Sequence, residues 1–286
     1  MLVFYTELII VNLIVTINKM SFLFNKLMTF SEWIEENADS RMKNFLFFGS
    51  YWPIVFILTF YFSFVLKFGP KFMKTRKPFN IDQIVMVYNT IQVVLNMYIV
   101  KEIFRLVWLR DDYTFHCIMI DYSDTDLAKE KLFVGWLIYL TKVLDLLDTV
   151  FFVLRKKDSQ LSFLHVYHHS MVLFFGWILL KFFPGGQAIF FGTINSCIHT
   201  IMYTYYLLTL IDHNYKKAWW KKYLTIIQLV QFVLSGLHAC MALMVNDCNF
   251  PKLFLAILLP QDMLMFVLFW NFYKKSYIKP HKLKHS

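Results

Sequence analysis

The sequence has 286 residues, of which 58% are apolar, 20% are aromatic and only 17% carry a charged side chain. A soluble domain has about 25% charged residues, and a globule of this size cannot hide so much apolar surface from water. The many aromatic residues also exclude a disordered chain. The composition therefore indicates one membrane domain that crosses a bilayer several times.

The formal net charge of +10 comes from 29 lysines and arginines, which gather in short gaps between apolar runs. Positive gaps of this kind are typical of cytoplasmic loops in membrane proteins, so the charge does not indicate nucleic-acid binding. The four cysteines lack paired CxxC spacing, which excludes a zinc ribbon and an iron–sulfur cluster.

The N-terminal apolar run, residues 2–17, is short and contains Glu7. It is compatible with a signal-like segment, although it lacks a basic start and a small-residue cleavage site. It is equally compatible with an upstream extension in which Met20 is an alternative start. We therefore leave this run unassigned within an N-terminal segment, residues 1–38.

Seven further runs of about 20 apolar residues predict seven transmembrane helices. None alternates apolar and polar residues as the strands of a membrane barrel would, so the predicted fold class is an all-α polytopic membrane protein. The membrane domain is expected over 39–273, followed by a basic tail, 274–286. The predicted spans lie near 51–68, 83–103, 133–154, 161–180, 187–210, 222–245 and 253–273.

Basic residues alternate between the gaps. The gaps after the first, third and fifth spans, together with the tail, hold 17 of the 29 lysines and arginines, whereas the gap between spans two and three is acid-rich. This pattern predicts a cytoplasmic tail and an N-terminus on the opposite side. In the tail, Lys282 and Lys284 resemble a dilysine retrieval signal of the endoplasmic reticulum, or simply belong to a basic tail that meets anionic lipid.

Polar side chains inside spans are costly and mark functional positions. Four consecutive spans carry nearly all of them. Steps of three and four residues place the three histidines on one helix face, and they do the same for Asn195, His199 and Tyr203 and for Gln228 and Gln231. At about 1.5 Å per residue, the four sets meet in the same cytoplasmic half. The sets are Lys142, Asp145 and Asp148; His165, His168 and His169; Asn195, His199, Tyr203 and Tyr206; and Thr225, Gln228 and Gln231.

Some of these groups also have plain structural interpretations. Lys142 can neutralise an aspartate on its own helix, the glutamines can join helices by hydrogen bonds, and a lone buried His199 is usually a satisfied histidine. Three histidines within five residues are harder to explain by packing alone. The spacing HxxHH suits a transition metal, as in membrane desaturases and hydroxylases, although those enzymes use several such boxes. Neutral imidazoles can instead act as general bases or acyl acceptors, and composition does not choose between these alternatives.

Four sequence boxes resemble, in order and separation, the signature boxes of the very-long-chain fatty acid elongase family. They are KVLDLLDT, HVYHH, NSCIHTIMYTYY and TIIQLVQF, and the earlier YNTIQV, which begins at Tyr88 and Asn89, is also similar to a family element. The resemblance extends from about Asp39 to Tyr277. One departure is Asp145, where the family usually has Glu.

The resemblance implies a 3-oxoacyl-CoA synthase of the endoplasmic reticulum membrane, with seven helices of which six surround a closed acyl tunnel. The implied reaction condenses an acyl-CoA with malonyl-CoA and releases CO2 and CoA. It requires no metal or redox cofactor, because loss of CO2 generates the carbon nucleophile. The implied partners are the bilayer, the reductases and dehydratase of the elongation cycle, and a second copy of the chain.

The resemblance also implies roles for the polar residues. His168 is the expected acyl acceptor, His199 faces it, and His165 and His169 orient it or share a proton. Asp145 and Asp148 are expected to fix the tautomers of the histidines, as orienting carboxylates do. The expected lining of the thioester and malonyl pocket comprises Lys142, Asn195, Tyr203, Tyr206, Gln228 and Gln231.

The predicted topology places Cys117 and Cys248 on the same, lumenal side, in the gaps between spans two and three and spans six and seven. That compartment permits disulfides, so we expect a bridge that staples the closed end of the tunnel. Cys197 and Cys240 lie within spans and are expected to be small apolar fillers.

Overall fold

The computed structural model describes residues 2–111, 113–248 and 250–278, and all regular structure in these ranges is helical. The predicted all-α class is therefore confirmed for the described part of the chain. Each of the seven predicted spans corresponds to a helix or to a helix with a continuing π turn. The elements are α1 (Leu2–Asn37), η1 (Ser40–Asn44), α2 (Trp52–Ser63), η2 (Phe64–Phe68), α3 (Gly69–Met73), α4 (Asp82–Ile103), η3 (Phe104–Trp108), α5 (Asp126–Leu154), α6 (Phe163–Phe182), α7 (Ala188–Ile211), η4 (His213–Lys217), α8 (Lys221–Met244), α9 (Lys252–Tyr273) and η5 (Lys274–Ile278).

Local capping sets where the functional helices begin. The third span starts at Asp126 and not near 133, because the Thr125 hydroxyl accepts a hydrogen bond from the backbone N–H of Ala128. The Ser162 hydroxyl accepts in the same way from the N–H of His165, which fixes the first turn of α6. The histidine box therefore starts directly at a capped helix end.

Five helical segments are long and apolar enough to cross a membrane, which indicates a multi-pass membrane protein. These segments are Trp52–Met73, Asp82–Trp108, Phe163–Phe182, Lys221–Met244 and Lys252–Ile278. The other two long helices of the bundle, α5 and α7, contain the lysine and aspartates of the first box and the polar residues of the third. Their apolar character is thus reduced by the same side chains that suggest a function.

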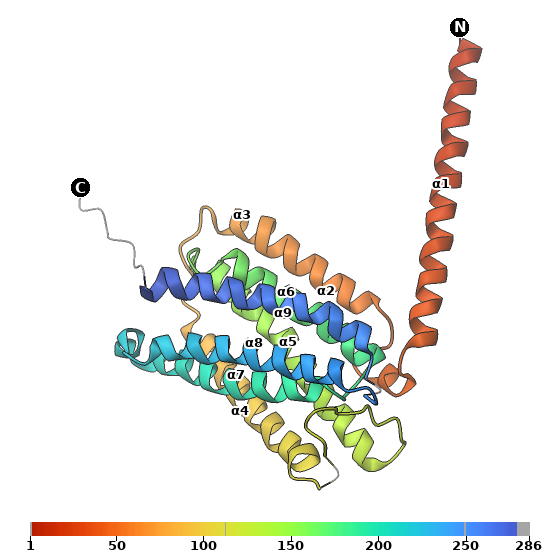
Figure 1. Cartoon of the computed structure of the whole chain (residues 1–286). Helices are drawn as coiled ribbons and strands as arrows, with labels where there is room; N and C mark the ends of the chain where they lie inside the picture. Colours follow the sequence, from red (N-terminus) through yellow and green to blue (C-terminus); the bar gives the residue numbers. More distant parts are fainter. Residues whose placement is uncertain (1, 112, 249, 279–286) are drawn as a thin grey trace.

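The long helices from α4 to α9 lie alongside one another (Figure 1), and their contacts form a closed sequence of neighbours. Helix α4 packs against α5 and α7, α7 against α8, α8 against α9, α9 against α6, and α6 against α5. The α2–α3 segment lies outside this set, against α6 and α5. The spatial order of the helices therefore differs from their order in the chain.

A disulfide between Cys117 and Cys248 joins the segment before α5 to the segment before α9. His238 of α8 is in hydrogen-bond contact with the carbonyl of Phe115 in the first of these segments, and its ring stacks on Phe190 with 3.9 Å between centroids. The sharp turn before α7 uses Gly186, whose φ of +56° favours glycine. We call this end of the bundle, marked by Cys117–Cys248, the disulfide end.

Helix α1 extends away from the other helices (Figure 1). Its last turns join the bundle through Glu35, whose carboxylate accepts a hydrogen bond from Lys181 at 3.0 Å. The same ammonium donates to the carbonyl of Phe48 at 2.8 Å, and the Lys181 residue is only 1% exposed. This buried lysine therefore connects α1, the segment after it and the end of α6. The apolar run 2–17 is part of this helix.

Candidate functional site

A cavity of about 270 Å³ lies among the six packed helices, and each of them contributes to its wall. Most of the lining is apolar, including Leu106, Phe191 and Phe254. Polar side chains enter the wall at particular positions, among them Lys142 and His168. The cavity is thus an apolar space with a polar region contributed by the sequence boxes.

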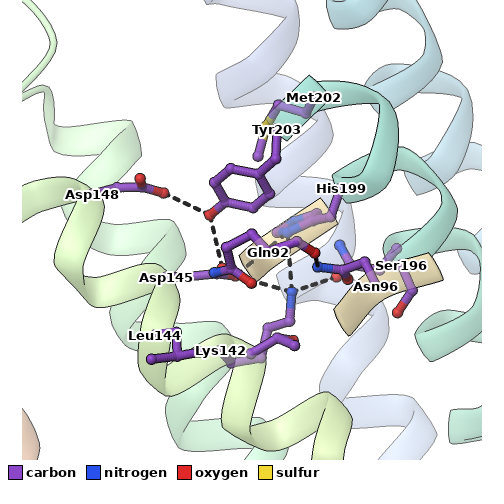
Figure 2. Close-up of polar contacts among 12 residues, drawn as sticks. Gln92, Asn96, Lys142, Leu144, Asp145, Asp148, Ser196, His199, Met202 and Tyr203 are labelled. Carbon is purple, nitrogen blue, oxygen red and sulfur yellow. Dashed lines mark hydrogen bonds and ion pairs between the residues drawn. The ribbon is translucent and has the colours of Figure 1, made fainter. Parts of the chain in front are cut away.

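Lys142 of α5 is the centre of a buried polar cluster (Figure 2). Its ammonium lies 3.0 Å from Asp145 Oδ2, donates to Asn195 Oδ1 at 2.7 Å and lies 3.3 Å from His199 Nδ1. The side chains of Lys142 and Asp145 are only 7% and 4% exposed. The Asp145 Oδ2 atom also lies 3.5 Å from His199 Nδ1. The Lys142–Asp145 ion pair is therefore more than a neutral pair within α5, because it also contacts Asn195 and His199 of α7.

The hydroxyl of Tyr203 lies between two carboxylates in the same cluster (Figure 2). It is 2.8 Å from Asp145 Oδ1 and 2.7 Å from Asp148 Oδ2, and it is 3.1 Å from the hydroxyl of Tyr88. A phenol carries a single proton, so it cannot donate to both carboxylates at once. One of the two contacts therefore needs a proton on the carboxyl side, and the cluster can store or pass a proton.

The three histidines of the α6 box differ in their partners. His165 Nε2 is 2.9 Å from the hydroxyl of Thr149, and its ring lies 4.2 Å from that of His169. His168 lines the cavity, and its buried Nδ1 atom has no hydrogen-bond partner within the described ranges. Its ring packs edge-on against Phe269 of α9, with 5.8 Å between centroids. Of these three, His168 is the one placed to meet a molecule in the cavity.

The remaining predicted site residues fall into two groups. Asn195 and Gln231 line the cavity with Lys142 and His168. Tyr206 packs near Tyr203 with 5.9 Å between ring centroids, and Gln228 contacts the sulfur of Met202 at 3.6 Å. Neither Tyr206 nor Gln228 belongs to the cavity lining.

Asp145 and Asp148 were expected to orient the histidines, and only one direct contact between these carboxylates and a histidine is present among the described residues. Asp145 approaches His199, whereas the described contacts of Asp148 run to Tyr203 and not to a histidine. The carboxylates therefore interact chiefly with Lys142, Tyr203 and Gln92, and the α6 histidines are held by other groups.

The sequence interpretation quoted YNTIQV of α4, which contains Asn89 and Gln92, only for its resemblance and gave these amides no role. Gln92 donates to Asp145 Oδ1 at 2.7 Å, and it lies with Asn89 and Asn96 at steps of three and four residues. All three amides are at most 2% exposed. The expectation that four spans carry nearly all of the intramembrane polarity was therefore wrong, because span two adds a polar stripe. The periodicity of these amides within an apolar run is the signal that would have found it.

The described residues contain no group of three or more His, Cys, Asp or Glu side chains that is arranged to hold a metal ion. The candidate retrieval residues, Lys282 and Lys284, lie outside the described residues. The two lysines therefore stay a prediction from the sequence.

Comparison with known proteins identifies the family. The family model described as ELO, the GNS1/SUR4 family, matches residues 46–285. The chain is 38% identical over 256 residues to very long chain fatty acid elongase 7 of Rattus norvegicus, covering 89% of this chain and 90% of that protein. It is 40% identical to elongase 1 of Mus musculus, covering 87% of this chain and 89% of the relative, and 40% identical to elongase 4 of Mus musculus, covering 94% and 85%. The resemblance seen in the sequence boxes is confirmed, and the chain belongs to the ELO family of very-long-chain fatty acid elongases.

Proposed function

We propose that this protein is a 3-oxoacyl-CoA synthase, the condensing enzyme of fatty acid elongation. It joins a long-chain acyl group to malonyl-CoA and releases CO2 and CoA. The observation that carries this proposal is an apolar cavity whose wall includes His168 and Lys142. An apolar space accommodates an acyl chain, and the polar cluster beside it supplies groups for chemistry at the thioester.

The proposed architecture has seven membrane spans, with six helices as a barrel around an acyl tunnel. The closed sequence of neighbours from α4 to α9 supports this arrangement, since the cavity is lined by all six. In the proposed orientation the disulfide end lies in the lumen of the endoplasmic reticulum and the C-terminal tail in the cytoplasm, and the charge of the gaps supports this orientation. The polar cluster then lies in the cytoplasmic half, and the basic gaps are available to the phosphates of CoA.

His168 is the proposed acyl acceptor. One imidazole nitrogen attacks the thioester carbonyl, a C–N bond forms, the C–S bond breaks, and CoA leaves as a thiol with the proton of the imidazole. Support for this choice comes from the position of His168 on the cavity wall and from its Nδ1 atom without a partner in the described part of the chain. The His169 ring meets that of His168 edge-on, and the His165 ring contacts that of His169. Both are proposed to orient the His168 ring or share its proton.

The second half of the reaction forms the new carbon–carbon bond. Malonyl-CoA loses CO2, and the electron pair of the broken bond remains as an enolate that attacks the acyl carbonyl. The C–N bond to His168 then breaks, and the imidazole takes a proton from water, because its first proton left with the CoA thiol. Lys142 and Asn195 are placed on the cavity wall, where they stabilise the negative oxygen that develops. His199, held by Lys142 and Asp145, is proposed to assist decarboxylation.

The balance of these steps requires neither a metal nor a redox cofactor, and we propose that none takes part. A desaturase or hydroxylase that uses the histidine box as metal ligands is the alternative in another class. Membership of the elongase family does not favour it.

The test uses the purified full-length protein with labelled malonyl-CoA and acyl-CoAs of graded length, without NADPH or added metal. A 3-oxoacyl-CoA product is expected. His168→Ala should lower its formation by roughly 10²- to 10⁴-fold. Without malonyl-CoA, the unsubstituted protein should retain labelled acyl groups and release CoA, and the variant should do neither.

The matched control is His213→Gln, which changes an exposed histidine of η4. This variant should keep full activity, and both variants should show the unfolding midpoint of the unsubstituted protein. Condensation or acyl labelling that survives in His168→Ala moves the acceptor to another residue. No product with any acyl-CoA overturns the proposed function.

A further inference from the structure

The apolar cavity carries a second polar feature, on the wall formed by α8 and α9. Ser235 and Asp262 both line the cavity, and neither side chain has a hydrogen-bond or ion-pair partner within the described ranges. Ser235 is only 2% exposed. A carboxylate and a hydroxyl facing an apolar space without partners are costly, so an ionisable residue of this kind marks a functional position.

The Asp262 carboxylate lies against the backbone of α8 at Gly236. Its Oδ2 atom lies so close to Gly236 of α8 that a Cβ added there would stand 3.2 Å away, tighter than nearly all real contacts. Gly236 follows Ser235 directly in the chain. The absence of a side chain at Gly236 therefore lets the carboxylate of α9 reach the wall beside the serine.

This polar pair lies away from the proposed acyl acceptor, toward the disulfide end. The His168 ring contacts Phe269, which lies seven residues after Asp262 in α9. At 1.5 Å per residue, Asp262 is about 10 Å farther along the helix. That step along α9 corresponds to several carbon atoms of an extended acyl chain. The α6 contact at this level is the hydroxyl at the end of the Tyr167 side chain, which donates to Gln261 at 2.6 Å.

We infer that Ser235 and Asp262 form a recognition site for a hydroxyl group on the acyl chain, at a mid-chain position. This inference rests on the proposed condensing function and deepens it by naming a substrate class, the hydroxylated acyl-CoAs. A hydroxyl can donate to the carboxylate and accept from the serine, so one group satisfies both. An unmodified methylene chain leaves both polar groups without a partner, and such sites discriminate strongly against the analogue that lacks the hydroxyl.

The experiment compares an unmodified long-chain acyl-CoA with isomers that carry one hydroxyl near the thioester, at successive mid-chain positions, or at the terminal carbon. Elongation of each is measured with the full-length protein in lipid vesicles. A mid-chain isomer should exceed the unmodified substrate in kcat/KM by roughly 10-fold or more, and isomers at either end should not.

Three variants separate recognition from folding. Asp262→Leu should abolish the preference and raise the relative rate on the unmodified chain, and Ser235→Ala should reduce the preference. Asp262→Asn keeps a polar group of the same shape and replaces the leucine variant in the test if that variant does not fold. It should weaken the preference. The control Met263→Leu changes an exposed neighbour on α9 and should leave the preference unchanged.

The outcomes distinguish the two proposals. If the unmodified chain is elongated and no hydroxylated isomer is favoured, or if Asp262→Leu keeps the preference, the recognition site is refuted while the condensing function stands. If no acyl-CoA gives a product, the condensing function fails and the inference fails with it. Thermal stabilisation of the protein by the same acyl-CoAs gives a readout independent of turnover, and it should rank the isomers in the same order.

Discussion

The Lys142–Asp145 pair offers a direct test of how the polar cluster is balanced. Lys142→Met removes the ammonium but leaves the carboxylate buried, with Gln92 and Tyr203 still donating to its Oδ1 atom. The Oδ2 atom, which faced the ammonium at 3.0 Å, loses its charged partner. The substitution therefore strands a negative charge inside the helix bundle.

The expected cost follows from the burial of both partners, whose side chains are 7% and 4% exposed. Removing one member of a buried ion pair typically lowers the free energy of unfolding by about 3–5 kcal/mol. Adding Asp145→Asn to Lys142→Met removes the stranded charge, and the amide oxygen still accepts from Gln92 and Tyr203. The double variant should therefore regain at least ~2 kcal/mol of the loss, since replacing both charges is far cheaper than stranding one.

The assay is denaturant unfolding of the two single variants and the double variant in mild detergent, analysed as a double-mutant cycle. Activity is measured on the same samples. Stability should return in the double variant, whereas condensation should not, because the polar cluster lacks the Lys142 ammonium in both. A Lys142→Met variant that loses less than ~1 kcal/mol, or a double variant less stable than Lys142→Met, would refute the reasoning.

Three further outcomes are expected. Cys117 and Cys248 should resist alkylation until they are reduced, and free thiols before reduction would contradict the bridge. Replacing both by serine should lower the free energy of unfolding by about 2–5 kcal/mol, measured by thermal unfolding with and without reductant. Gly176→Leu should shorten the longest product without slowing the elongation of short substrates. The reason is that Gly176 lines the cavity and that a Cβ there meets only Tyr139, at 3.6 Å. An unchanged product profile would place the acyl chain elsewhere. Lys181→Met should lower the free energy of unfolding by about 1–3 kcal/mol and increase proteolysis of α1, since the lysine joins α1 to α6. An α1 that is cut no faster in the variant would contradict that role.

The sequence was sufficient for the features that depend on composition and spacing. The seven apolar runs predicted the long helices of the bundle, and the alternation of basic gaps brought Cys117 and Cys248 to one side, where the structure joins them. The first and third boxes were predicted to meet, and Lys142 does contact Asn195 and His199 across α5 and α7. These features follow from helix periodicity and from the topology of a bilayer protein.

The partners of individual side chains were not predictable in the same way. Gln92 reaches Asp145 only because α4 packs between α5 and α7, and that neighbour order is set by tertiary packing, not by periodicity. Asp148 was expected to orient a histidine, yet its contact is with Tyr203, and Gln228 contacts Met202 and does not reach the cavity wall. Asp262 and the preceding Gln261 interrupt an apolar run, and the position of Asp262 on the cavity wall depends on the close approach of α9 to Gly236.

The order of the helices around the cavity has a consequence for biosynthesis. Tyr88 of α4 finds Tyr203 of α7, and 115 residues separate the two in the chain. At about 5–20 residues per second, the ribosome needs on the order of ten seconds to produce the second partner after the first. During that interval Tyr88 lacks its α7 partner, whereas Gln92 meets Asp145 of α5 only 53 residues later in the chain. We therefore expect the polar stripe of α4 to be completed in two steps, first by α5 and then by α7, with water or the insertion machinery satisfying Tyr88 until α7 has been synthesised.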